Sequence, residues 1–183
     1  LAVVALVVVS VVVPVTSASA QTSKAGYSWH VADDFLEQAV GSPPWAIASA
    51  PNGDWIQIDG TGVMDVAAKT ASGEGRFIHN FAGGGSASGT FTAERLLSFQ
   101  FYGCGGEGLP DFLCGGLAKL EVTLTPDFDP SVHSPGILWI DCVLGEDIPS
   151  GGEPARGEGI RLNVRGINFN HTEHSGFTVF VAE

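Results

Sequence analysis

Residues 133–145 contain the pattern that most restricts the fold of this chain, an alternation of side chains with a period of two. Leu138, Ile140, Cys142 and Leu144 fall on one face and are all apolar. Successive side chains of a strand point to opposite sides, so this pattern predicts a strand with one buried face. The opposite face carries Ile137, Trp139 and Asp141.

A second alternation lies just before the first, at residues 117–125. Apolar side chains occupy every other position, beginning at Ala118 and ending at Leu124, and Lys, Glu and Thr fill the positions between them. Two such stretches separated by a turn-rich loop are typical of a hairpin. We therefore predict that the two strands pair antiparallel across residues 126–135.

Shorter strand patterns and glycine-rich turns make up most of the remaining chain. One short helix is predicted over residues 33–40, because Asp33 is a favourable N-cap and Gly41 a favourable C-terminal stop. Residues 60–62 are interpreted as a turn, and Leu97, Phe99 and Phe101 as one inward face. Further strands are predicted at 27–31, 55–59, 63–68, 75–81, 90–93, 96–103, 160–166 and 177–181.

Turn signals about every 8 to 12 residues, with no crossover helices, indicate an antiparallel β-barrel or β-sandwich. We predict an all-β fold in which an antiparallel meander closes into a small barrel, with one short N-terminal helix. A two-sheet β-sandwich is the alternative. No repeat or internal boundary is visible, so residues 21–183 are predicted to form a single domain.

Residues 1–20 have the character of a signal peptide. Residues 1–15 are almost entirely Val, Ala and Leu, and Ala18-Ser19-Ala20 matches the small-x-small cleavage pattern. Because the chain starts at Leu1 rather than Met, we expect the charged start of this peptide to be missing. The sequence thus predicts a secreted, extracellular protein with no membrane span after processing.

The formal net charge of −12 makes the chain acidic. Nucleic acids and anionic lipids are bound through basic patches, so neither is an expected partner. The chain also lacks a dinucleotide fingerprint, a phosphate-binding loop and a nucleophile elbow, and we expect no cofactor.

Three cysteines are present, at positions 104, 114 and 142. Cys104 and Cys114 bracket a loop between two predicted strands, where a disulfide would form in an oxidising compartment. Cys142 lies on the apolar face of its strand, where a thiol behaves as a small hydrophobic side chain. We predict a Cys104–Cys114 bridge and a buried Cys142 thiol.

Two groups of polar residues are candidates for binding. His171, Glu173 and His174 carry side chains of the kinds that ligate zinc, although a solvated loop between strands explains them better. Trp139 and Asp141 place an indole beside a carboxylate, an arrangement suited to sugars or flat ligands, unless a second layer packs there. Trp55 and His133 complete the candidate ligand-binding set.

Short motifs in the middle of the chain resemble those of a family. Gly73-Glu-Gly-Arg-Phe77, Leu97-Ser-Phe-Gln-Phe101, and His133-Ser-Pro-Gly136 before Ile140-Asp-Cys142 are similar, in order and spacing, to motifs of a group of uncharacterised secreted bacterial β-rich proteins. This chain departs from the group in its Cys104 to Cys114 insertion and in lacking a simple His-Gly step. The resemblance implies bacterial secretion and a β fold, and no activity.

Two functions are compatible with these observations. The first is a non-enzymatic binding or surface protein whose partner is a small molecule or a glycan. The second is a small barrel enzyme, an isomerase or lyase, with His and carboxylates such as Asp59, Asp65 and Asp141 in its lumen. A packed interior favours the first function, and an enclosed polar cavity favours the second.

Overall fold

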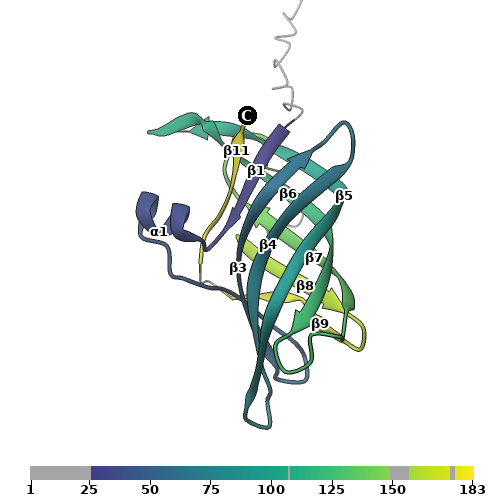
Figure 1. The fold of residues 1–183 in the computed structure, drawn as a ribbon. Coiled ribbons are helices and arrows are strands. Elements are labelled where there is room, and N and C mark those ends of the chain that lie inside the picture. The colour runs from purple at the N-terminus through teal and green to yellow at the C-terminus, as the bar shows by residue number, and fades with distance from the viewer. Residues whose placement is uncertain (1–25, 107, 149–156, 174–175) are drawn as a thin grey trace, which may run out of the picture.

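The computed structural model describes residues 26–106, 108–148, 157–173 and 176–183, which form antiparallel strands and one helix (Figure 1). The predicted signal peptide, residues 1–20, lies outside this part of the chain. In chain order the elements are β1 (Gly26–Val31), α1 (Asp34–Val40), β2 (Ala46–Ser49), β3 (Trp55–Asp65), β4 (Thr70–Asn80), β5 (Ser86–Gly106), β6 (Leu109–Pro126), β7 (Ser134–Cys142), β8 (Gly159–Val164), β9 (Ile167–Phe169), β10 (His171–Thr172) and β11 (Thr178–Ala182).

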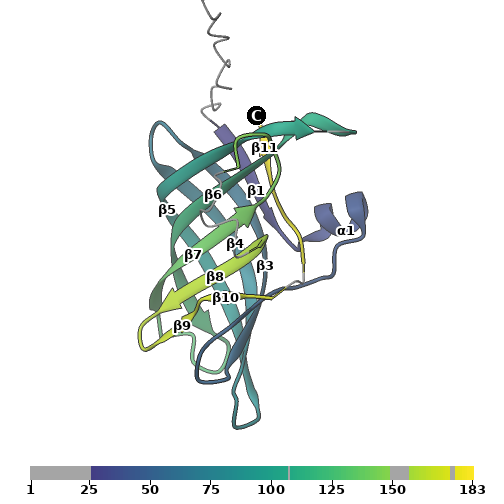
Figure 2. The same ribbon diagram turned by 180° about the vertical axis from the view of Figure 1, so that it is seen from behind.

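Six strands form a closed hydrogen-bonded ring. The ring runs in the order β1, β3, β4, β5, β6 and β11, and β11 pairs again with β1. The strands β7, β8 and β9 continue from β6, and β2 and β10 continue from β3 (Figures 1 and 2). β8 also lies beside β10, where Thr172 Oγ1 donates a 2.8 Å hydrogen bond to the Ile160 carbonyl. The predicted antiparallel β fold with one short helix is confirmed.

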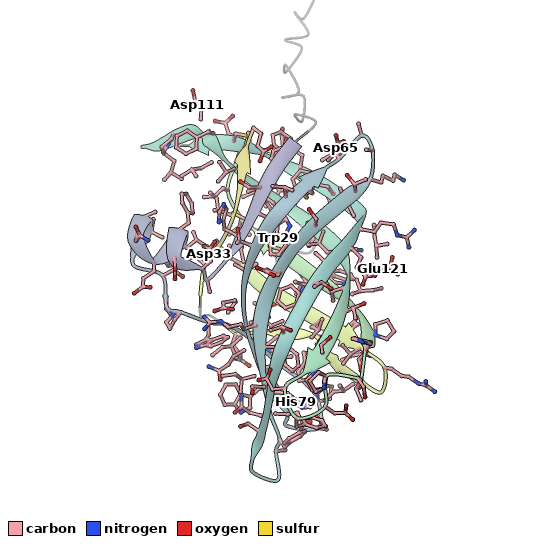
Figure 3. All side chains as sticks on the ribbon, viewed as in Figure 1. Trp29, Asp33, Asp65, His79, Asp111 and Glu121 are labelled. Carbon is pink, nitrogen blue, oxygen red and sulfur yellow. A yellow bond between two sulfur atoms is a disulfide. The ribbon has the colours of Figure 1, made fainter. Side chains whose placement is uncertain are left out.

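Aromatic side chains pack in the middle of this ring. Trp29, which lies behind β3 and β4 in Figure 3, stacks on Phe91 with ring centroids 6.5 Å apart. The Phe99 ring lies 5.1 Å from Tyr27 and 5.0 Å from Phe180. Aliphatic side chains of β3, β6, β7 and β8 complete the same core, which includes Ile56, Ile58, Leu120, Leu138, Ile140, Ile160 and Leu162.

Gly60 and Gly62 lie within the continuous strand β3, so the predicted turn at residues 60–62 is wrong. An ideal Cβ at Gly62 would lie 2.6 Å from Trp29 Cζ2 and 2.1 Å from the Ser72 carbonyl oxygen. The glycine is required because the indole packs directly against the strand backbone. A glycine inside a strand marks such a close approach as often as a turn.

Strand β5 also differs from the prediction. It is one long strand, and residues 90–93, predicted as a short edge piece, form its middle between β4 and β6. The register with β6 shifts just after Leu96, and this bulge exchanges the two faces. Leu96 is therefore buried and Leu97 is not, whereas Phe99 and Phe101 pack against the core as predicted.

The predicted pairing of β6 with β7 is confirmed. Leu120 lies opposite Leu138, and Ala118 lies opposite Ile140. The apolar face of β7 is fully buried, and it includes the free thiol of Cys142. Burial raises the pKa of that thiol well above its ordinary value, so the group is neutral and inert.

The predicted bridge between Cys104 and Cys114 is also confirmed, because a disulfide joins these two residues. The two residues lie opposite each other in the ladder between β5 and β6, which extends onward to Gly106 and Leu109. The two strands are therefore paired up to this point, with a register shift between Cys104 and Gly106, where a loop was predicted. Within the described residues, no helix is long and apolar enough to cross a membrane.

Candidate functional site

Trp139 lies on the outer side of β7 between two cationic side chains. Lys119 on β6 and Arg161 on β8 are its neighbours in the two ladders. The Lys119 Nζ atom lies 3.8 Å from the centre of the indole ring, and Arg161 Cζ lies 5.0 Å from it. Both are cation–π arrangements, so a ligand at Trp139 would share the indole with two cations.

The other residues of the predicted ligand set lie in different surroundings. Asp141 is 1% exposed and accepts a 3.0 Å hydrogen bond from Arg161. Trp55 begins β3, and His133 lies before β7 with its Nδ1 atom 3.1 Å from Thr125 Oγ1. In the described part of the chain, neither Trp55 nor His133 makes a hydrogen bond or ring contact with Trp139. Of the predicted ligand set, only Asp141 shares a neighbour with Trp139, since both contact Arg161.

The predicted metal ligands are only partly described. His171 Nδ1 lies 3.3 Å from Glu173 Oε1; the His171 side chain is largely exposed and that of Glu173 is about half exposed. Ser49 Oγ donates a 2.8 Å hydrogen bond to the same Glu173 oxygen. His174 lies outside the described residues. Among those that are described, no three His, Cys, Asp or Glu side chains are grouped to hold a metal ion.

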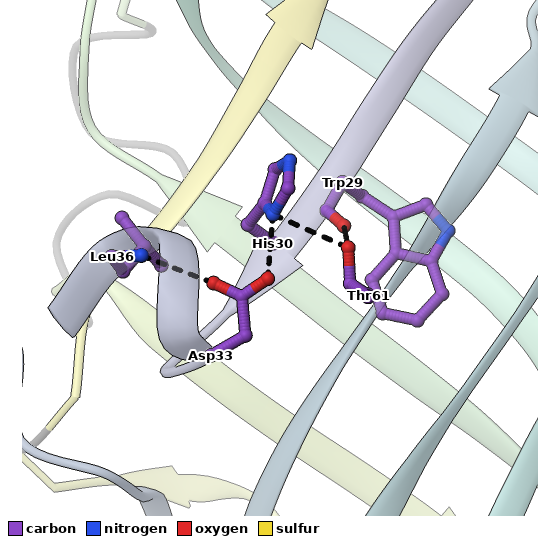
Figure 4. Close-up of polar contacts among 5 residues, drawn as sticks. All are labelled: Trp29, His30, Asp33, Leu36 and Thr61. Atoms are coloured by element: carbon purple, nitrogen blue, oxygen red, sulfur yellow. Dashed lines mark hydrogen bonds and ion pairs between the residues drawn. The ribbon is translucent and has the colours of Figure 1, made fainter. Parts of the chain in front are cut away.

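A hydrogen-bonded cluster anchors the start of α1 to β1 (Figure 4). Asp33 is the N-cap, and its Oδ1 atom accepts a 3.2 Å hydrogen bond from the Leu36 N–H. Its Oδ2 atom lies 2.6 Å from Nδ1 of His30. Thr61 Oγ1 lies 3.2 Å from that nitrogen and donates a 3.1 Å hydrogen bond to the Trp29 carbonyl. The helix cap is thereby connected to both β1 and β3.

Both ends of α1 are also tied to Phe177, the residue that precedes β11. The Ala32 N–H donates a 2.9 Å hydrogen bond to the Phe177 carbonyl. The Phe177 N–H in turn donates a 2.9 Å hydrogen bond to Ser42 Oγ, just beyond the C-cap Gly41. The helix stands beside the ring in Figures 1 and 2, and these bonds fix its distance from β11.

An apolar cavity of about 230 Å³ opens between this helix and the ring. We call it the helix groove. Its walls come from five separate parts of the chain, and nearly all of its lining side chains are apolar. They are Phe35, Leu36, Ala39, Val40, Leu109, Leu113, Leu144, Glu158, Phe177, Thr178 and Val179.

The wall opposite α1 is the projecting hairpin of β5 and β6. Leu113 of this wall pairs with Val181 of β11, and Cys114 pairs with Phe180, so the hairpin is joined to the ring. The disulfide closes the hairpin at the same level. The segment with Leu144 packs against Gly115, where an ideal Cβ would lie 1.9 Å from the Leu144 carbonyl oxygen. These contacts set the width of the helix groove.

Among the residues that the structure describes, Glu158 is the one acidic residue that lines the helix groove. Its Oε1 atom accepts a 3.0 Å hydrogen bond from the Thr178 N–H. Burial raises the pKa of this carboxyl and the nearby Asp141 raises it further, whereas the backbone hydrogen bonds oppose the shift. Across the described residues, no Lys, Arg or His forms an ion pair with Glu158. A carboxyl group without a cation thus lies in an apolar setting.

A wider, polar depression lies on the outer face of β3, β4 and β5, with a volume of about 590 Å³. Two of its carboxylates are engaged by the protein itself. Asp59 forms an ion pair with Arg76, and Asp33 caps α1. The Arg76 guanidinium also lies 5.2 Å from the centre of the Trp45 ring. This depression is wide, polar and open, so the helix groove is the stronger candidate site.

Sequence reasoning did not find the helix groove. The groove contains exposed apolar side chains, such as those of Phe35, Val40, Leu109 and Phe177. These residues lie in separate parts of the sequence and form no pattern that would predict a shared cavity. No protein-family model, no curated protein and no solved structure matches this chain.

Proposed function

We propose that the chain is a secreted, non-enzymatic binding protein that takes a small apolar molecule into the helix groove. The observation that carries this proposal is a preformed apolar cavity with one carboxyl group among its lining residues. Small-molecule sites have this composition, since apolar walls supply most of the affinity and a few polar groups set orientation. The tethered helix supports it as well, because a wall held in place loses little entropy when a ligand binds.

The packed core favours binding over the alternative of a barrel enzyme with lumenal carboxylates. We regard the six-stranded ring as a small barrel whose inside is filled by rings such as Trp29, Phe91 and Phe99. Asp59 and Asp65 alternate with the inward-facing Ile58 and Met64 of β3, so they lie on the outer face. A packed interior of this kind favours binding outside the ring over a lumenal active site.

A neutral fluorescent probe, N-phenyl-1-naphthylamine, tests the proposal. We expect the wild-type protein to bind it saturably, with a rise in fluorescence on transfer from water to the apolar groove. Val40→Trp places an indole in the groove and should weaken binding at least about tenfold. Val132→Trp is the matched control, because Val132 is also exposed but lies between β6 and β7.

The control variant should bind the probe as the wild type does. An absence of saturable binding to the wild type would overturn the proposal. So would equal loss of binding in the two Trp variants, since the probe would then bind elsewhere.

A further inference from the structure

We infer that the helix groove selects amphiphilic amines, and that the Glu158 carboxylate is the counter-ion of the bound ammonium group. This inference rests on the proposed function and names the ligand class of the same groove. It follows from three properties of the site: an unpaired carboxyl group, apolar walls around it, and the charge of the whole chain.

The first property is the isolation of Glu158 from cations. Arg161, a cation on β8, is engaged by Asp141 at 3.0 Å. Glu158 itself accepts a hydrogen bond from a backbone N–H and forms no ion pair within the described residues. A half-buried carboxylate in apolar surroundings is costly when no cation lies beside it, and an ammonium group brought by a ligand would offset that cost.

The second property is the distribution of apolar surface. Val40, Leu109, Leu113 and Leu144 surround the groove and offer contact to an alkyl or aryl tail. A volume of about 230 Å³ suits a compact tail rather than a large lipid. The same groove would exclude a strongly hydrated cation without a tail, because such an ion gains nothing from apolar walls.

The third property is the net charge of −12. A field of this sign attracts cations and repels anions at long range. A fatty acid would also bring a second carboxylate close to Glu158, and like charges at short distance are strongly unfavourable. An amine is therefore favoured over an alcohol of the same length, and an alcohol over an acid.

The test compares octylamine, octanol and octanoate, which share one tail length, as competitors of the bound naphthylamine probe near pH 7. An alkylamine is protonated there, as a lysine side chain is. For the wild-type protein we expect octylamine to bind at least about tenfold more tightly than octanol, and octanoate to bind most weakly. Glu158→Gln should lower the affinity for octylamine to that for octanol and leave the affinity for octanol unchanged.

Glu146→Gln is the matched control, because Glu146 is an exposed acid in the segment that follows β7 and does not line the groove. This variant should keep the preference for the amine. The ranking of the three ligands on the wild type needs no variant, so it decides the inference even if Glu158→Gln fails to fold.

The outcomes separate the two proposals. If the probe binds but octanol competes as well as octylamine, or octanoate competes best, the amine inference is wrong and the proposed function stands. If neither the probe nor any competitor binds, both fail. A monomer–dimer equilibrium that is abolished by Val40→Trp in sedimentation experiments would also overturn the inference, since a second copy of the chain would then be the occupant.

Discussion

At the scale of single residues, Ile140 and Trp139 show how one strand places neighbouring side chains in different surroundings. Ile140 is fully buried between Ala118 of β6 and Ile160 of β8. Trp139 lies on the other face, is half-buried, and contacts the side chains of Lys119 and Arg161. The alternation visible in the sequence accounts for this difference in full.

Ile140→Ala should lower the free energy of unfolding by about 2 to 5 kcal/mol, the range for a large-to-small change in a core. Trp139→Ala should cost less, about 1 to 2 kcal/mol, because it removes cation–π contacts and partial burial only. Urea unfolding of both variants measures the two losses. A larger loss at Trp139 than at Ile140 would mean that the face of Trp139 is the more tightly packed one.

Glu158 should make stability depend on pH. Its raised pKa means that the folded protein holds the proton more tightly than the unfolded chain does. The contribution of Glu158 to stability therefore falls as the pH rises from the ordinary value of 4.5 through the raised one, because the folded state then carries an unfavourable charge.

Glu158→Gln removes this dependence. The stability of the variant relative to wild type should increase as the pH rises from the ordinary value of 4.5 through the raised pKa of Glu158. Urea unfolding at several pH values gives the difference in unfolding free energy between the variant and wild type. If the amide itself changes stability by a fixed amount, that amount is the same at every pH and does not affect the trend. A difference that stays flat or declines with pH would contradict the assignment of a raised pKa to Glu158.

At the scale of elements, α1 depends on its caps. A helix of seven residues is too short to be stable alone, so its position is set by its ends and its tertiary contacts. Asp33 serves both purposes, as it caps the helix and contacts His30. Leu36 is the one helical side chain buried against the ring.

Asp33→Ala should destabilise the protein by about 1 kcal/mol, the usual cost of losing an N-cap, and should weaken binding of the naphthylamine probe. Asp34→Ala is the control, because Asp34 is exposed in the first turn and does not cap the helix, and its interaction with the helix dipole is worth a few tenths of a kcal/mol. Thermal unfolding and probe titration of both variants provide the comparison. Equal effects at the two positions would show that the cap does not hold the groove wall.

At the scale of the whole molecule, the glycines of β3 and β4 allow large rings to pack inside the six-stranded ring. Gly62 and Gly73 face each other across the ladder, and the Trp29 indole lies against both. The backbone itself is thus part of the core surface. A side chain at either position would push the indole or the neighbouring strand away.

Gly62→Ala should therefore cost about 1 to 3 kcal/mol, as overpacked cores do. Gly83→Ala should have little effect, because nothing lies within 4 Å of an added Cβ there. Urea unfolding and tryptophan fluorescence of both variants test this expectation. An unchanged stability of Gly62→Ala would mean that Trp29 has room to move.

The sequence predicted what local patterns determine and missed what distant contacts determine. Alternation at Leu138 and Ile140 identified a strand and its buried face, and the Asp33 and Gly41 signals identified the helix. Gly62 was wrongly assigned to a turn. A glycine is needed there because the Trp29 ring, which belongs to another strand, packs against the backbone. Leu97 was misread because one bulge reverses the period of two. The helix groove could not be predicted from the sequence, since its walls come from distant segments that meet only in the folded chain.

The double attachment of α1 to Phe177 has a consequence for the opening motions of the protein. The amide protons of Ala32 and Phe177 are both bonded across the gap between the helix and β11. Neither can exchange with deuterium unless the helix parts from that segment, so the two should exchange together as one cooperative unit. Spontaneous parting would also be the event that widens the cavity, and the exchange rate of these two amides would set an upper limit on how fast a tightly enclosed guest can leave.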